Sequence, residues 1–239
     1  GDASVEEDLW RSLEDMEDGP SAEEAEPEPD SRDRGSRRRD SHVPWENLES
    51  LGFFPGLFQT VQQVMLSPKE FFRSMPSKGG LGQPTTFHVL IMEIPVLALV
   101  FWLMSGLLPK GQIDAEGIFQ VGLTGVQAVT LLLAAPVFTL VNIFVSSGLY
   151  HLLLRAVGGG STEFEGTFRV VCYSVAPMVL ALVPVFGMWV GLIWQLICTF
   201  HGFRIVHGLS QVKAALPIVL LHLSIILLLL SGSGASGLA

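Results

Sequence analysis

The stretch Phe168–Arg204 reads FRVVCYSVAPMVLALVPVFGMWVGLIWQLICTFHGFR, and it decides the predicted fold. Between the two arginines near its ends, its only titratable side chain of basic character is His201. The run is interrupted at Pro184–Gly187, and Pro and Gly are the residues that end one helix and begin the next. We predict two membrane-spanning helices joined by a tight turn. Each half has about 16 residues and is roughly 24 Å long as a helix, so other helices must shelter the turn.

Composition and charge place the chain among membrane proteins. It is 49% hydrophobic and 15% charged, with a mean hydropathy of +0.48. Residues 1–43 hold fifteen of the 23 acidic and six of the 14 basic side chains, and therefore the whole net charge of −9. The acidic balance belongs to this tail, and we expect no nucleic-acid partner.

The tail itself is expected to be disordered because it has too few apolar residues to offset chain entropy. Its five arginines at 32–39 either form part of a solvated linker, which we favour, or contact anionic lipid or a partner. No secretory signal is present in this acidic segment. Because the chain begins with Gly rather than Met, we expect that an N-terminal piece is missing.

The segment 53–66 combines apolar residues at helical spacing with too many polar residues to cross a membrane. The apolar positions are Phe54, Leu57, Phe58, Val61, Val64 and Met65. The polar positions, assigned to the other face, are Gln59, Thr60, Gln62 and Gln63. This 14-residue pattern predicts a helix that lies in the membrane interface.

A second short helix is predicted after Ser67. Ser67, Pro68 and Glu70 match a capping box with Pro in the first turn, and Pro76 should end the helix. Its basic and aromatic side chains are expected to contact lipid. These lipid-interface residues are Lys69, Phe71, Phe72, Arg73 and Lys78. The alternative is an amphipathic helix that packs on the bundle.

Five membrane-spanning helices are predicted. The first covers Phe87–Leu108, the second lies within Leu123–Leu154, the third and fourth are the two halves of Phe168–Arg204, and the fifth covers Ala214–Leu230. The predicted fold class is an all-α polytopic membrane helix bundle with five transmembrane helices. We divide the chain into a disordered tail (1–43), interfacial amphipathic helices (44–86), the transmembrane domain (87–231) and a disordered C-terminus (232–239).

Basic residues in short loops predict the orientation, because they are retained on the cytoplasmic side of a membrane. With the N-terminus inside, the cytoplasmic side carries seven basic residues near the spans, and the opposite side carries Lys110. The seven are Lys69, Arg73, Lys78, Arg155, Arg169, Arg204 and Lys213. We predict a cytoplasmic N-terminus and a C-terminus on the other side of the membrane.

Several short motifs follow one another along the hairpin and its flanks. They are Gly158-Gly159-Gly160-Ser161, Phe164-Glu165, Phe168-Arg169, Tyr173-Ser174 with Pro177, Pro184 with Gly187, and Gly202 with His207. In this order they resemble the Yip1 domain family, in which a Tyr-Ser-x-x-Pro element opens the third span and a glycine follows at the next turn. The stretch 67–72, Ser-Pro-x-Glu-Phe-Phe, resembles the bacterial branch of the family.

The resemblance covers about residues 45–230 and implies five spans, a cytoplasmic N-terminus and a bacterial inner membrane. Eukaryotic relatives are associated with Rab-type GTPases and with traffic between the endoplasmic reticulum and the Golgi. This chain lacks the Asp-Leu-Tyr-Gly-Pro element of those relatives ahead of the first span, which argues against GTPase binding here. For the bacterial branch the resemblance supplies no activity.

One carboxyl group, Glu93, lies inside a predicted span, and Pro95 follows it closely. An ionisable group in hydrocarbon normally faces the bundle interior, and Pro95 frees a backbone carbonyl nearby. On the predicted topology the other spans supply partners in the same leaflet: His151, Arg155, Tyr173, His201, Arg204 and His222. This group is interpreted either as an ion, proton or lipid-headgroup site, or as a polar contact that fixes helix packing. We favour the second because Glu93 is shallow enough to reach water.

Helix packing is assigned to the family motif and to one pair of glycines. The motif residues are Tyr173, Ser174, Pro177, Pro184, Gly187 and Gly191. Gly187 and Gly191 form a GxxxG that would let spans three and four approach closely, although a turn explains Gly187 equally well. His201 and His207 are about 120° from a shared helical face, and Cys172 and Cys198 have no paired spacing. We therefore predict no metal site and no disulfide framework.

No HExxH, GxSxG or P-loop motif is present in the sequence. We expect a non-enzymatic scaffold without a cofactor, which organises membranes and recruits partners or lipids through its cytoplasmic N-terminal region. Membrane lipids are the expected partners, and the sequence leaves a homo-oligomer open. The alternative is a channel or transporter for an ion, proton or lipid that uses Glu93, because Pro-interrupted short spans are typical of transporters. No inverted repeat is evident.

Overall fold

The computed structural model describes residues 43–105, 124–159 and 162–235, with the side chains of 229–235 excluded. All regular structure in these ranges is helical. The tail up to residue 42, the loop with Lys110 and the last four residues lie outside the described part, so the predictions for them stay predictions. Val43, which we had assigned to the disordered tail, is fully buried. Ordered structure therefore begins no later than this residue.

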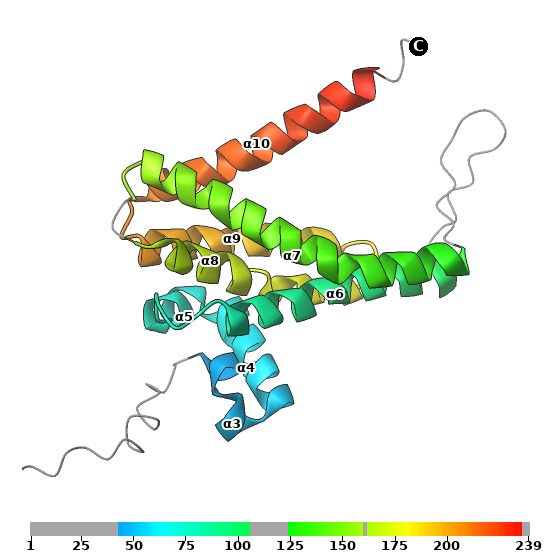
Figure 1. Ribbon diagram of the computed structural model, residues 1–239, viewed down its shortest axis with the longest axis horizontal. Coiled ribbons are helices and arrows are strands. Elements are labelled where there is room, and N and C mark those ends of the chain that lie inside the picture. Colours follow the sequence, from blue (N-terminus) through cyan, green and yellow to red (C-terminus); the bar gives the residue numbers. More distant parts are fainter. Residues whose placement is uncertain (1–42, 106–123, 160–161, 236–239) are drawn as a thin grey trace, which may run out of the picture. The chain divides into compact units, whose positions relative to one another are not determined.

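Within the described ranges, five helical segments are long and apolar enough to cross a membrane, as predicted. Their elements are α6 (Gly82–Ser105), α7 (Gly125–Ala156), α8 (Phe164–Tyr173) with the 3₁₀ helix η2 (Ala176–Leu182), α9 (Gly187–Val206) and α10 (Gln211–Ala235). Figure 1 shows their arrangement. The predicted fold class, an all-α polytopic bundle with five spans, is confirmed.

Span one starts earlier than predicted, at Gly82 rather than Phe87. Pro84 lies in the first turn, where its missing N–H has no helical partner to lose. The earlier start changes the position of Glu93. This carboxyl group is about three turns from the beginning of the helix rather than two, and therefore deeper along the span than the sequence indicated.

Span three is two short helices rather than one. Pro177 has no N–H and its ring excludes a carbonyl four residues back, so the α-helical ladder cannot continue through it. Met178 N–H instead donates to the Val175 carbonyl at 2.8 Å, a bond of the 3₁₀ type. Because a 3₁₀ helix rises about 2 Å per residue, α8 and η2 together reach about 29 Å, close to the thickness of the hydrocarbon layer.

The broken span is also the centre of the bundle. In its apolar window 78% of the residues are buried inside protein, against 17% to 33% in the other four spans. α8 packs against α6, α7 and α9, and η2 packs against α6, α9 and α4 (Phe53–Leu66) (Figure 1). The elements around span three shelter its interrupted backbone, as an irregular segment in lipid requires.

The region before span one is helical, but α4 is rotated relative to the prediction. It follows η1 (Pro44–Asn47) and α3 (Leu48–Leu51). Its buried stripe consists of Gly56, Thr60 and Val64, although Thr60 had been assigned to the polar face. The reason is a close approach to η1. A Cβ at Gly56 would lie 3.1 Å from the Pro44 carbonyl oxygen, and Thr60 Oγ1 accepts the Trp45 N–H at 2.8 Å.

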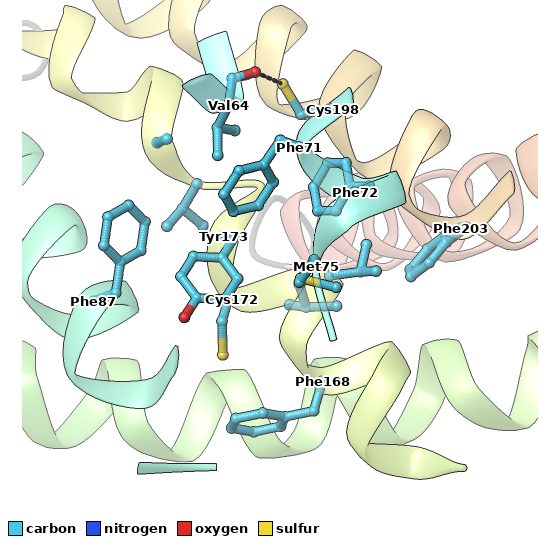
Figure 2. Packing of buried hydrophobic residues seen from close by; sticks show 14 of the residues in the cluster. Val64, Phe71, Phe72, Met75, Phe87, Phe168, Cys172, Tyr173, Cys198 and Phe203 are labelled. Atoms are coloured by element: carbon cyan, nitrogen blue, oxygen red, sulfur yellow. Dashed lines mark hydrogen bonds between the residues drawn. The ribbon is translucent and has the colours of Figure 1, made fainter. Parts of the chain in front are cut away.

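The predicted lipid contacts of α5 (Pro68–Ser74) are partly wrong. Phe71 and Phe72 are only 3% and 1% exposed and belong to the core (Figure 2). Phe71 packs edge-on against Tyr173, and Phe72 lies against α9 at Gly202, which has no side chain to exclude it. The capping box is also absent, because the Ser67 side chain makes no capping bond.

Candidate functional site

A fully buried arginine, Arg169, lies on α8 at the centre of the bundle. Its Nη2 donates to Glu46 of η1, whose side chain is 9% exposed. The Tyr173 hydroxyl, one turn further along span three, donates to the same carboxylate oxygen at 2.5 Å. We call Glu46, Arg169 and Tyr173 the clamp. It joins the segment before span one to the central span through a charge pair that is shielded from water.

The loop between α5 and α6 is held by the same arginine. Arg169 Nη1 donates to the Gly80 carbonyl at 3.2 Å. Glu165 Oε1 accepts the backbone N–H groups of Gly79 and Gly80, both at 2.6 Å. Both glycines have positive φ, at 153° and 95°, and a Cβ at Gly79 would lie 3.4 Å from Nη1. The loop therefore favours glycine at both positions for its backbone conformation.

A second contact ties η1 to span one. Trp45 is 2% exposed, and its indole N–H donates to the Gln83 carbonyl at 2.8 Å. Its ring also packs edge-on against Phe87 of α6 and Phe53 of α4. Together with the clamp, this contact fixes the interfacial region to spans one and three. Such polar attachments are specific in geometry because each donor has a defined acceptor.

Lys78, for which lipid contact was predicted, forms an ion pair with Glu163. Its Nζ lies 2.7 Å from Glu163 Oε1, with both side chains about two-thirds exposed. The hydrogen bond and charge of Glu163 raise the pKa of Lys78 above its ordinary value. Exposed pairs of this kind contribute little to stability. The contact does show that the loop before α6 lies beside the start of α8.

Two histidines that are far apart in sequence meet at one threonine. Thr167 is fully buried, and its Oγ1 lies 2.9 Å from His151 Nδ1 and 3.1 Å from His207 Nε2. His207 Nδ1 lies 3.4 Å from the Gly159 carbonyl oxygen. Burial lowers the pKa of His207, which lies just beyond α9, and the nearby His151 lowers it further. The neutral form of His207 is therefore favoured.

The donor and acceptor of each hydrogen bond in this series follow from the chemistry of the last acceptor, the Gly159 carbonyl. A carbonyl only accepts, so Nδ1 of neutral His207 carries the proton and Nε2 accepts from Thr167. The threonine has a single hydroxyl proton, so His151 Nδ1 must donate to it. The chain from His151 through Thr167 to His207 and Gly159 is thus polarised in one direction. Protonation of His207 would reverse one bond and leave the buried hydroxyl proton without this acceptor.

The predicted group around Glu93 is not joined by direct polar contacts. Among the described residues, none of the six predicted partners forms a hydrogen bond or ion pair with Glu93, and its Oε1 is buried without a partner. Tyr173 binds Glu46, His151 binds Thr167, and His222 Nδ1 lies 2.8 Å from the Ile218 carbonyl of its own helix. His201 and Arg204 both belong to α9, where the charge of Arg204 is felt at His201. The charge of Arg155 is felt at His151.

The glycine pair of α9 makes the close approach that the GxxxG spacing indicated. A Cβ at Gly187 would lie 1.8 Å from the Leu180 carbonyl oxygen, and one at Gly191 would lie 2.9 Å from the Pro177 carbonyl oxygen. Both contacts are to backbone atoms of η2. Gly187 also follows the turn at Pro184, whose carbonyl accepts the Phe186 N–H at 2.8 Å. Ser174 is buried at the end of α8, and its Oγ has no hydrogen-bond partner among the residues that the structure describes.

The sequence did not lead us to Glu46 or Thr167, and Arg169 was considered only as one of the basic residues that predict the orientation in the membrane. A signal for the clamp was present. Arg169 lies among apolar residues inside a span, and a buried charge requires an opposite charge. Few acidic residues outside the tail could meet that need. No comparable signal marked Thr167, because pairing over 16 and 40 residues depends on how the helices pack.

Five apolar spans, a buried interhelical ion pair and a preceding amphipathic region define a polytopic integral membrane protein. The family model of the Yip1 domain matches residues 63–233, which is well over half of the chain. The chain therefore belongs to the Yip1 domain family, as the order of its motifs indicated. No curated protein and no solved structure matches it.

Proposed function

We propose that this member of the Yip1 family is a non-enzymatic scaffold that organises the membrane around a rigid cytoplasmic platform. The platform consists of η1, α3, α4 and α5. The observation that carries the proposal is the combination of a buried attachment on one side of the platform with an exposed aromatic face on the other. A platform of this kind transmits a force on its outer face to the bundle, because the clamp fixes η1 to span three.

The outer face belongs to α4. Phe54 and Phe58 are 78% and 68% exposed, and Leu66 lies on the same side at 72%. The opposite face is occupied by η1 through the stripe at Gly56 and Thr60. Large, exposed aromatic side chains are what an interfacial helix inserts between lipid headgroups and acyl chains. This arrangement favours lipid, rather than the bundle, as the neighbour of the aromatic face.

The basic loops support a cytoplasmic location of the platform. Thr162 Oγ1 donates to the Val206 carbonyl at 3.0 Å, and Lys213 Nζ lies 3.4 Å from where a Cβ of Gly158 would stand. With the Lys78–Glu163 pair, these contacts bring the loops before α6, α8 and α10 to one end of the bundle. Since basic loops are retained in the cytoplasm, we place this end, and the platform with it, on the cytoplasmic side of a bacterial inner membrane.

Spin labelling tests whether lipid covers the aromatic face. Cys172 and Cys198 are buried, so a nitroxide will react with an introduced cysteine in preference to them. In liposomes, a label at Phe58→Cys should be more accessible to oxygen, which partitions into lipid, than to a water-soluble nickel chelate. A label at Gln63→Cys, on another side of α4, should show the reverse. Equal preference for the nickel chelate at both positions would contradict the lipid-facing orientation.

Vesicle shape tests the organising function itself. Wild-type protein reconstituted at rising density should reduce the mean vesicle diameter in electron micrographs. The double variant Phe54→Ser/Phe58→Ser should leave vesicles as large as protein-free ones, because it removes the aromatic side chains that insert into the membrane. Gln62→Ser is the matched control, since it changes a residue of the same exposed face without removing apolar area. If the double variant shapes vesicles like the wild type, the platform is not the organising element.

A channel or transporter is a second candidate, and one observation favours it. Glu93 Oε1 is buried in α6 without a hydrogen-bond partner among the described residues, as a carboxylate awaiting an ion or proton would be. Ion or lipid flux into proteoliposomes should then fall when Glu93→Gln replaces the wild type. Flux that is equal in both and no greater than in empty vesicles would end this proposal.

A further inference from the structure

The packing of α5 on α9 brings a lysine of α5 into the neighbourhood of a histidine and an arginine of α9. The contact point is Phe72, whose ring lies 3.3 Å from where a Cβ of Gly202 would stand. Lys69 precedes Phe72 by three residues and therefore shares its face of α5. His201 is adjacent to Gly202, and Arg204 follows in the last turn of α9. Lys69 therefore lies on the face of α5 that packs on α9, and Arg204, three residues after His201, neighbours that histidine on α9.

The side chain of His201 faces the junction between α4 and α5. On the same side of α9, the Trp194 indole N–H donates to the Met65 carbonyl at 3.0 Å. Cys198 Sγ donates to the Val64 carbonyl at 3.6 Å (Figure 2). His201 is three residues after Cys198 and seven after Trp194, so it lies on this face. Its Nδ1 is buried and has no hydrogen-bond partner in the described part of the chain.

In the part of the chain that the structure describes, no acidic side chain pairs with the charges at this junction. Lys69 and Arg204 both act electrostatically on His201. Within the described ranges, neither cation forms an ion pair. Glu70 is next to Lys69 in sequence, but it binds Arg73 at 2.6 Å. Two cations beside an unpartnered imidazole nitrogen form a site that an anion would complete.

We propose that Lys69, His201 and Arg204 bind a phosphate group, and that an anionic lipid of the cytoplasmic leaflet supplies it. Phosphate oxygens accept hydrogen bonds from an ammonium, a guanidinium and an imidazole N–H, which are the three groups present. Basic pockets between helices on the cytoplasmic side are suited to lipid headgroups. The site names a ligand beyond the proposed scaffold function, and it rests on that function only for the membrane side. Inorganic phosphate offers the same oxygens, so the test must separate the two sources.

Native mass spectrometry of the full chain in detergent gives the binding constants. Phosphatidylglycerol should bind more tightly than phosphatidylcholine, which has the same phosphodiester but no net charge. Lys69→Gln should weaken phosphatidylglycerol binding about fivefold, and Lys69→Gln/Arg204→Gln about 25-fold, since each cation near a lipid phosphate contributes about that factor. Arg73→Gln is the matched control. It removes one positive charge from the same helix, but a charge that Glu70 already neutralises, so binding should change less than twofold.

Two further measurements make the result decisive. The first measurement monitors the unfolding of each variant through the reaction of a fluorogenic dye with the buried cysteines, and it shows whether the variant is folded. If the double variant does not fold, the single variant Lys69→Gln, which changes an exposed residue, still tests the site. Competition by inorganic phosphate that also depends on Lys69 would support the site with free phosphate as its ligand. Equal binding of the two lipids, or equal losses in Arg73→Gln and Lys69→Gln, would overturn the site. Vesicle diameter is measured independently, so failure here is distinguishable from failure of the scaffold proposal.

Discussion

The clamp predicts a large loss of stability for a substitution that removes one charge and no volume. In Glu46→Gln, the guanidinium of Arg169 stays fully buried and loses the carboxylate with which it pairs. Breaking a buried pair from one side costs about 3 to 5 kcal/mol, because the remaining charge is left without compensation. The Tyr173 hydroxyl loses its carboxylate acceptor at the same time. For a chain of this size, we expect the unfolding temperature to fall by about 6 to 20 °C.

The native cysteines provide the assay. Cys172 and Cys198 are the two cysteines of the chain, and both are fully buried. A maleimide dye that fluoresces after reaction with a thiol will therefore report unfolding in detergent without any engineered label. Cys172 adjoins Tyr173, so its exposure reports opening of the clamp directly. The unfolding temperatures of wild type and Glu46→Gln should be compared at the same detergent concentration and pH.

A matched control separates a buried pair from an exposed one. Glu70 also forms an ion pair with Arg73, but their side chains are 70% and 64% exposed, so Glu70→Gln should lower stability by less than about 1 kcal/mol. Glu46→Gln/Arg169→Gln should be less unstable than the sum of its single variants, because no uncompensated charge stays buried. A shift for Glu46→Gln no larger than that of Glu70→Gln would refute the assignment of the clamp as a buried ion pair.

The remaining predictions concern local backbone and protonation. Gly187→Ala places a Cβ against the Leu180 carbonyl and should destabilise by about 1 to 3 kcal/mol in the thiol assay, whereas Gly148→Ala meets open space within α7 and should stabilise by up to about 1 kcal/mol. Val185 has a φ of 68°, so Val185→Gly should raise the unfolding temperature by a few degrees; a decrease would show that this backbone is not strained. Burial lowers the pKa of His207, so the unfolded state binds its proton first as pH falls. Stability should therefore decline from pH 7.5 to pH 5 in tryptophan-monitored unfolding, with a shallower decline in His207→Gln, and equal slopes would contradict the neutral assignment.

Much of the architecture could be predicted from the sequence because the hydrophobic pattern is one-dimensional. Long apolar runs separated by charged or Gly-rich segments define spans wherever they fold, since a membrane requires about 20 apolar residues to cross it. The five spans and the packing of Gly187 on the preceding segment followed from that rule and from residue size. The break in span three could have followed from Pro177 alone, because the missing N–H is a property of the residue.

Which side chains meet across the bundle was decided by the tertiary structure. Glu46 and Arg169 are 123 residues apart, and no period in the sequence relates them. The face of α4 was mispredicted for the same reason: hydrophobicity assigned Thr60 to solvent, and η1 covers it because Gly56 allows the backbone to approach. Phe72 was likewise predicted to contact lipid, but it packs against α9 at Gly202. Sequence determined which segments are apolar enough to enter the membrane, whereas helix rotation and contact, which depend on many distant residues at once, decided which of their side chains became buried and paired.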